Sequence, residues 1–157
     1  MFDKIKIKRF DYADSEYHKL PFVVDVVLSR RKFAKSLIDH HHWLVGKGGA
    51  KASFKGEYIR SFPKVVNNLS GIDFRDAYMK DLCWKSIIML YSDLRGAYIV
   101  DCDLSRTDFS FSKMCGAYFR NCNLDYANFR GCDIRCTTFV GIDMTFTKLE
   151  REYKNDS

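Results

Sequence analysis

Residues 92–131 read SDLRG AYIVD CDLSR TDFSF SKMCG AYFRN CNLDY ANFRG when they are written in groups of five. The first residue of each group is small, and the third is large and apolar. The same step extends outward, so that 17 consecutive third positions from Leu69 to Leu149 are apolar in a chain that is 46% apolar overall. An α-helix repeats every 3.6 residues and a β-strand every two, so neither produces this period. The stretch is therefore an internal repeat of the kind that builds solenoids.

The residue that precedes the apolar centre completes the pattern. It is Asp or Asn in many groups, as at Asp93, Asp103 and Asn123, and the consensus is small–(Asp/Asn)–(Leu/Phe)–x–x. This consensus resembles the pentapeptide-repeat family over residues 67–151. The resemblance implies a mainly β fold, a right-handed quadrilateral β-helix in which each pentapeptide forms one side of a square and four form a coil. About four coils are expected, with positions one coil apart stacked above one another.

Residues 1–66 do not follow the repeat and form a separate region in our interpretation. We expect a small α/β head that caps the N-terminal end of the β-helix, because an uncapped stack exposes unpaired strand edges. Its expected elements are strands at residues 4–8, 22–28 and 53–62 and a helix from about Ser29 to His42. The last residues, 152–157, are expected to form a polar tail.

The net charge of +6 is concentrated in this head. Residues 1–65 carry 14 Lys or Arg against 7 Asp or Glu, whereas residues 66–157 carry 12 against 13. Basic clusters neutralise phosphates in nucleic-acid-binding proteins, although they are also typical of an ordinary solvated face. The cluster consists of Arg30, Arg31, Lys32, Lys35, Lys47, Lys51 and Lys55.

Several classes of protein are not expected. No apolar run reaches the roughly 18 residues that span a bilayer, and the first ten residues lack the apolar core of a signal peptide. We therefore expect a cytoplasmic protein of a bacterium or a phage-infected host cell. An enzyme is not predicted, because all four histidines lie in the head and a regular β-helix lacks a deep pocket. The consecutive residues His40–His42 point in different directions on a helix, so neither a metal nor a cofactor is predicted.

Residues that are 20 positions apart should stack on successive coils, which places three tyrosines in one column and an acidic column beside it. Tyr78, Tyr98 and Tyr118 form the first column, and Asp81 and Asp101 belong to the second. Tyrosines combine a large contact area with a polar tip and are enriched in interfaces, so these two columns are a candidate partner-binding surface. The alternative is that the stacked rings only stabilise an outer face of the β-helix.

A second candidate surface consists of apolar residues at positions that should point outward. Ile88, Leu90, Tyr91 and Phe111 share one face in the expected fold. Such clusters are unusual on the exterior of a soluble protein. Either the N-terminal head covers them or they contact a partner, so Tyr91 and Phe111 are included among the candidate partner-binding residues.

The resemblance also implies an end-to-end contact. Many pentapeptide-repeat proteins similar to this one dimerise through the C-terminal coil, where Phe146 and Leu149 would supply apolar surface. Cys102 and Cys122 are expected to stack inside the β-helix as small core residues. A disulfide between them is disfavoured in a reducing cytoplasm.

These features favour a binding protein. The family that the repeat resembles includes DNA-mimicking regulators of topoisomerases, but the near-neutral repeat region lacks their acidic surface. Our main hypothesis is a non-enzymatic inhibitor or modulator that binds a protein complex acting on nucleic acid, such as a phage or mobile-element anti-defence protein of the anti-CRISPR type. One alternative is direct nucleic-acid binding by the basic head, with the β-helix as a rod or dimerisation unit. The other is a topoisomerase-modulating DNA mimic.

Overall fold

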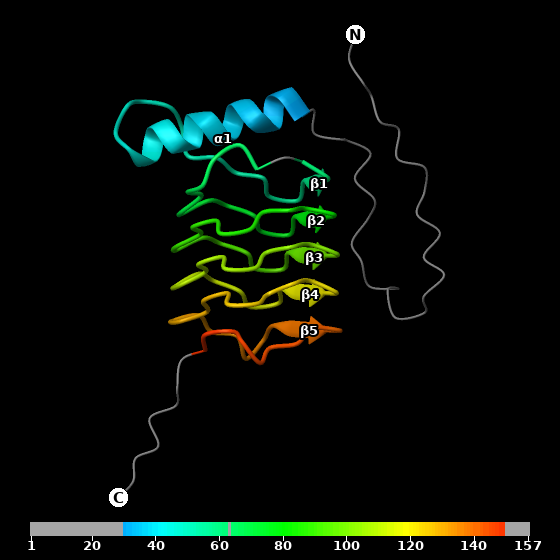
Figure 1. Ribbon diagram of the computed structural model, residues 1–157. Helices are drawn as coiled ribbons and strands as arrows, with labels where there is room; N and C mark the ends of the chain where they lie inside the picture. The colour runs from blue at the N-terminus through cyan, green and yellow to red at the C-terminus, as the bar shows by residue number, and fades with distance from the viewer. Residues whose placement is uncertain (1–29, 63, 150–157) are drawn as a thin grey trace, which may run out of the picture.

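The computed structural model describes residues 30–62 and 64–149. Five short strands form one parallel sheet in the order β1-β2-β3-β4-β5, and a helix lies at its N-terminal end (Figure 1). The elements are α1 Arg30–Leu44, β1 Tyr58–Arg60, β2 Tyr78–Lys80, β3 Tyr98–Val100, β4 Tyr118–Arg120 and β5 Thr138–Val140. Among the described residues, no helix is long and apolar enough to cross a membrane.

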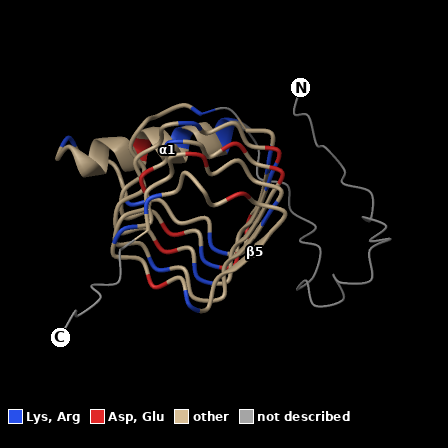
Figure 2. Ribbon diagram, turned by 60° about the horizontal axis from the view of Figure 1, so that its bottom comes forward, with Lys and Arg blue, Asp and Glu red and all other residues tan. Residues whose placement is uncertain are grey.

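The chain winds into a right-handed quadrilateral β-helix of about four coils, which confirms the predicted fold. Each strand pairs in parallel with the equivalent strand of the next coil, Tyr78 with Tyr98 and Tyr98 with Tyr118. The same step joins isolated bridges on the other sides, such as Asp93 with Lys113. A view from nearer the axis shows the squared outline of the stacked coils (Figure 2).

Inward side chains fill the β-helix in layers. The apolar centres from Leu69 to Phe129 are buried, and aromatic centres stack directly, as Phe109 does on Phe129 with ring centroids 5.1 Å apart. The small polar residues two positions before a centre turn their hydroxyls toward backbone carbonyls. Ser112 Oγ, for example, donates to the carbonyl oxygen of Met89 at 2.6 Å. The buried hydroxyls are therefore satisfied, which removes the penalty of burying a polar group.

A local hydrogen bond explains the Asp or Asn before each centre. Its side-chain oxygen accepts the backbone N–H of the residue two positions later, as Asp108 does from Ser110 at 3.0 Å. Such Asx turns fix a bend in the backbone. The bond is made by Asn68, Asp73, Asp93, Asp103, Asp108, Asn123, Asn128, Asp133 and Asp143. The Asp or Asn of the consensus therefore has a structural role in each of these nine turns.

Pentapeptides end at corners where the backbone enters the left-handed region. The corner residues Asp81, Asp101 and Asn121 have φ angles of 54°, 54° and 50°. Asp and Asn adopt this conformation more readily than most residues, because their short polar side chains bond locally. Tyr91 and Phe111 occupy corners with φ angles of 54° and 61°. The acidic column thus reflects corner geometry, whereas the aromatic corners have no such backbone preference behind them.

Helix α1 lies across the N-terminal end of the β-helix (Figure 1). The buried ring of Phe33 packs against Phe62 and Trp84, with ring centroids 4.7 and 5.8 Å apart. His40 is fully buried, and its Nδ1 accepts the backbone N–H of Ala52 at 3.1 Å. Burial lowers the pKa of His40, so the imidazole is neutral at neutral pH. The helix is therefore joined to the first coil by an apolar contact and by a buried polar one.

The regular pairing begins before Leu69, the first centre in the counted repeat. Tyr58 in β1 already pairs with Tyr78 in β2, so residues 53–62 run in the first coil and not in a separate head. The centre that precedes Leu69 by one step of five is Lys64. Its side chain is exposed, and its Nζ donates to the backbone carbonyl oxygen of Lys85 at 2.8 Å. This charged centre interrupts the apolar series in the sequence. The strands expected at 4–8 and 22–28 lie outside the described residues.

The C-terminal coil is less enclosed than the coils before it. Its centres Ile134, Phe139 and Met144 are only partly buried. Phe146 and Leu149 are 52% and 44% exposed. Among the described residues, no element packs over this end (Figure 1). The apolar surface needed for an end-to-end contact is therefore present, and the dimer itself stays a prediction.

Candidate protein-binding surface

Three exposed aromatic side chains line one corner of the β-helix. Tyr91 and Phe111 stack with ring centroids 5.2 Å apart and planes inclined by 12°. Trp43 of α1 continues the column, because its ring lies 3.9 Å from where a Cβ on the corner residue Gly71 would be. The exposed fractions are 43% for Trp43, 67% for Tyr91 and 50% for Phe111. These three residues are called the aromatic strip below.

Glycine makes room for the strip at its C-terminal end. Gly131 follows Phe111 in the same corner column, has a φ of 72°, and would carry a Cβ that collides with Cδ1 of Phe111. The phenyl ring therefore lies directly over the glycine backbone. Large aromatic residues seldom adopt a positive φ. Two of them at the same corner of successive coils therefore raise the conformational energy of the fold. Exposed rings bury little surface in return, which is more typical of a functional position than of a stabilising one.

The neighbouring corner carries a second exposed aromatic pair. Tyr126 and Phe146 stack with ring centroids 5.5 Å apart, and the Arg106 guanidinium lies 5.5 Å from the centroid of the Tyr126 ring. The side between the two corners presents Ile88, which is exposed, and Leu90, which is half-buried. Ile88 stays exposed beside helix α1, and residues 1–29 of the N-terminal region lie outside the described residues. Apolar groups therefore gather on two adjacent corners and on the side that joins them.

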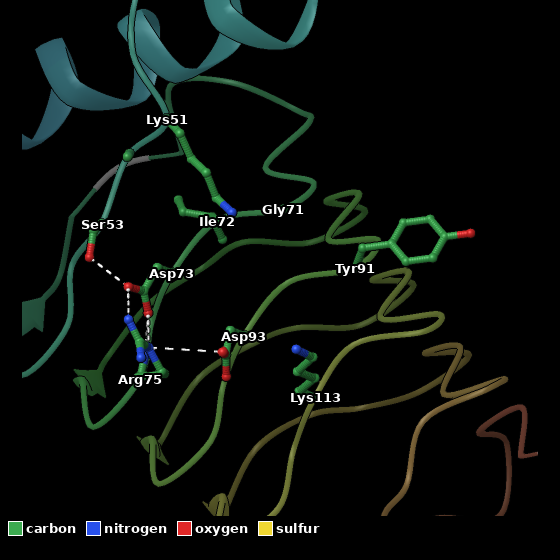
Figure 3. Close-up of a pocket in the computed structure, with 10 residues that line it drawn as sticks. Lys51, Ser53, Gly71, Ile72, Asp73, Arg75, Tyr91, Asp93 and Lys113 are labelled. Carbon is green, nitrogen blue, oxygen red and sulfur yellow. Dashed lines mark hydrogen bonds and ion pairs between the residues drawn. The ribbon is translucent and has the colours of Figure 1, made fainter.

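A hollow of about 330 Å³ lies beside the aromatic strip (Figure 3). Tyr91 borders it on one side, and the coils contribute Asp73 and Asp93 on the other. Lys51, from the segment after α1, and Lys113 also line it. The hollow therefore places charged groups next to an exposed aromatic ring.

Arginines neutralise both carboxylates in the hollow. Arg75 donates through Nε and one terminal nitrogen to the two oxygens of Asp73, each at 2.9 Å. Asp93 is held in the same way by the arginine two positions later. These bonds hold the pKa of both carboxyls below the usual range. Within residues 30–62 and 64–149, neither Lys51 nor Lys113 lies within ion-pair distance of a carboxylate, so the hollow presents a net positive charge.

The tyrosine column that the sequence predicts is longer than expected and more enclosed. Tyr58 stacks on Tyr78 with ring centroids 5.1 Å apart, and Tyr98 packs against Tyr118 at 5.7 Å. Tyr58 is buried and the other three are half-buried. The rings therefore bury much of their surface against one another, which supports the stabilising interpretation more than the binding one.

Basic residues pair with the acidic column beside these tyrosines. Arg60 Nε donates to Asp81 Oδ2 at 2.8 Å, and Lys80 Nζ lies 3.5 Å from Asp101 Oδ2. Asn121 also donates to Asp101, at 3.3 Å. Acidic and basic positions are interspersed over the coils (Figure 2). This side therefore lacks the continuous negative charge that a DNA mimic requires.

The predicted basic cluster lies at the N-terminal end of the rod. Arg31, Lys32 and Lys35 are exposed on α1, and Lys35 forms an ion pair with Asp39 at 2.7 Å. Arg30 is the first residue of the helix. Lys47, Lys51 and Lys55 are exposed in the segment that follows. Among the described residues, no group of three or more His, Cys, Asp or Glu is arranged to hold a metal ion.

The sequence patterns did not identify several residues of the candidate surface and its surroundings. Trp43 joins it only because of the way α1 crosses the first coil, and no sequence pattern indicates that crossing. Lys113 looks like one member of a charge ladder, and only the structure shows it lining the hollow. Tyr126 lies one coil before Phe146, so the stacking rule would have found that pair.

Comparisons with known proteins agree with the fold. The family described as pentapeptide repeats matches residues 91–125, 102–141 and 114–151, with eight copies in all. A trypsin-treated variant of QnrB1, a plasmid-mediated fluoroquinolone resistance protein, is 22% identical, with a TM-score of 0.50 over 62% of this chain and 51% of its own. The chain thus spans about half the length of that structure. alr5209, a pentapeptide repeat protein from Nostoc PCC 7120, is 19% identical over 73% of this chain and 94% of its own, with a TM-score of 0.31.

No curated protein matches the chain in sequence. At 22% identity, the likeness to QnrB1 shows a shared fold and nothing about activity. Up to residue 149, where the described part of the chain ends, the family match lies within the coils of the β-helix. The repeat match over residues 91–151 and the quadrilateral β-helix together show that this part of the chain consists of pentapeptide repeats.

Proposed function

We propose that the protein is a non-enzymatic binding protein that docks another protein on the aromatic strip and the hollow beside it. The observation that carries this proposal is the exposure of three large aromatic rings in one column, Trp43, Tyr91 and Phe111. Exposed aromatic clusters on a soluble protein are typical of interaction surfaces, and Trp and Tyr are the residues most enriched among binding hot spots.

The hollow adds specificity to this surface. Lys51 and Lys113 line it, whereas its carboxylates are already held by arginines. A partner segment with apolar side chains and a carboxylate would satisfy the rings and the ammonium groups together. The favoured partner surface is therefore apolar with acidic groups at its edge.

The class of partner is proposed from the family resemblance. Pentapeptide-repeat proteins include regulators of enzymes that act on DNA, so we favour a protein complex that handles nucleic acid and an inhibitory or modulating role, of the kind found in phage anti-defence proteins. The surface does not favour the DNA-mimic alternative. Several aspartates of the coils form ion pairs with basic residues: Asp73, Asp81, Asp93, Asp101, Asp103 and Asp133.

The proposal is tested by affinity capture with a double variant, Tyr91→Asn and Phe111→Asn. Asn removes both rings yet suits a left-handed corner, as Asn121 does in this β-helix. The matched control is Asp101→Asn, at a corner away from the strip. A partner that is captured by the wild type and the control, and lost from the double variant, supports the proposal. Full capture by the double variant refutes it.

Direct nucleic-acid binding is the second candidate, and the exposed basic residues at the N-terminal end favour it. Labelled duplex DNA would be titrated by fluorescence anisotropy at two salt concentrations, with the wild type and with Arg31, Lys32 and Lys47 replaced by Ala. Each lost phosphate contact should lower the slope of log affinity against log salt by about 0.9. An absence of binding at low salt removes this candidate.

A dimer through the C-terminal coil is proposed as the oligomeric state. Phe146 and Leu149 are exposed at the open end of the rod, where apolar centres are only partly buried. Light scattering after size exclusion should give twice the mass of one chain. Leu149→Asp should give a monomer, because a charge would have to be buried without a partner. A monomeric wild type at micromolar concentration contradicts this assignment.

A further inference from the structure

Two exposed cysteines lie side by side on adjacent coils. The backbone N–H of Gly116, the residue after Cys115, donates to the carbonyl oxygen of Cys136 at 2.9 Å. The register between β4 and β5, continued back along both coils, aligns Cys115 with Arg135, so Cys136 is one step further along the neighbouring coil. Both cysteines are exposed at the surface. The fold thus brings together two thiols that lie on different coils and far apart in the sequence.

The spacing of the coils suits a disulfide between them. Neighbouring parallel strands lie about 4.8 Å apart, and one further residue along the chain gives a Cα separation on the order of 6 Å. Disulfides span Cα separations of roughly 4.4–6.8 Å. The Cys115 thiol is also hydrogen-bonded to Cys136, and this contact raises the pKa of Cys115. A bridge therefore requires rotation of the two side chains and little movement of the backbone.

The other stacked cysteine pair provides a contrast within the same chain. Cys102 and Cys122 also lie on adjacent coils, but both point into the core and are 2% and 6% exposed. Their thiols donate to backbone carbonyls, from Cys102 to Val100 at 3.2 Å and from Cys122 to Ile99 at 3.3 Å. An oxidant in solution cannot reach them while the coils are closed. Accessibility therefore separates the two pairs, although their spacing along the rod is similar.

We propose that Cys115 and Cys136 form a redox-active dithiol that a small-molecule disulfide, such as oxidised glutathione, converts into an intramolecular disulfide. The thiolate of one cysteine attacks a sulfur of the oxidised compound, forms a mixed disulfide and releases one small thiol. The second cysteine then attacks the protein sulfur of the mixed disulfide and releases the second small thiol. Two protein thiols are oxidised and one small disulfide is reduced to two thiols. Excess reduced thiol reverses both steps.

The bridge would act as a clamp on the open end of the β-helix. It would tie the coil of Cys115 to the C-terminal coil, whose centres are only partly buried. Closing a loop of about 20 residues restricts the unfolded chain, and we expect the oxidised protein to melt roughly 5–10 °C higher than the reduced protein. The oxidation state would therefore control how firmly this end of the rod is held.

The test uses the full chain in glutathione buffers of graded redox potential, followed by peptide mapping with mass spectrometry under non-reducing conditions. The expected product is a peptide pair linked by Cys115 and Cys136, which dithiothreitol separates. In Cys115→Ser, the lone Cys136 should instead keep a glutathione adduct, and Cys136→Ser should leave the same adduct on Cys115. Cys83, which is exposed, is the internal control and should carry only an adduct.

Two results would overturn the proposal. One is that Cys115 and Cys136 of the wild type remain separate glutathione adducts or free thiols when Cys83 is fully modified. The other is that Cys102–Cys122 is the bridge that forms. Circular dichroism of the two serine variants shows whether they keep the β-helix, so loss of the bridge is distinguished from loss of the fold.

Discussion

Replacing Phe109 with alanine should remove one ring from a cluster of packed phenylalanines inside the rod. Phe109 is fully buried, stacks on Phe129 at 5.1 Å and meets the edge of Phe119 at 6.3 Å. Rigid coils above and below prevent the site from collapsing, so the full penalty of a cavity is expected. A buried Phe→Ala change of this kind lowers the free energy of unfolding by about 3–5 kcal/mol.

Phe139 provides the matched comparison in the last coil. It stacks on Phe119 at 5.3 Å, but it is only partly buried and no described coil lies below it. Its replacement by alanine loses contacts on one side only, and we expect a loss of about 1–2 kcal/mol. Urea unfolding followed by circular dichroism measures both variants, and the midpoint for Phe109→Ala should fall further. Equal losses at the two positions would refute the reasoning that stability is a sum of contacts between neighbouring coils.

Three further perturbations concern the buried histidine, the Asx turns and the glycine below Phe111. Burial lowers the pKa of His40, so the unfolded chain takes up the proton first and the free energy of unfolding should fall as the pH drops below about 6.5. The melting temperatures of the wild type and His40→Gln should therefore differ above that pH and converge below it. Asp108→Asn should unfold like the wild type in urea because the amide oxygen preserves the Asx turn, whereas Asp108→Ala should lose about 1 kcal/mol. Gly131→Ala should lower the free energy of unfolding by about 1–2 kcal/mol through strain at positive φ, and should change the near-ultraviolet circular dichroism as the Phe111 ring is displaced.

The fold was predictable because the repeat is a property of residue order alone. The step of five places a large side chain at each layer of the core, and the step of one full coil correctly places Tyr78, Tyr98 and Tyr118 in register. The start of the β-helix was not predictable in this way. Lys64 occupies a centre position and hides the fact that Phe54 and Ile59 continue the same series of buried centres.

The candidate surface was predictable only in part. Tyr91 and Phe111 follow from the stacking rule, since both occupy equivalent outward positions on successive coils. The role of the acidic residues did not follow, because a sequence does not distinguish an Asp that closes a turn from one that presents charge. Trp43 depends on the crossing of two elements, which is decided by the packing of Phe33 against the first coil.

Site-specific photo-crosslinking shows whether a partner protein contacts the aromatic strip. A photoreactive phenylalanine analogue would be placed at position 91, 111 or 118 in separate variants, with irradiation in the cell of origin. If a partner contacts the aromatic strip, positions 91 and 111 should give a crosslinked protein of the same identity. Position 118, which lies in the enclosed tyrosine column, should give none. A crosslink from position 118 together with silence at positions 91 and 111 would contradict the proposed contact.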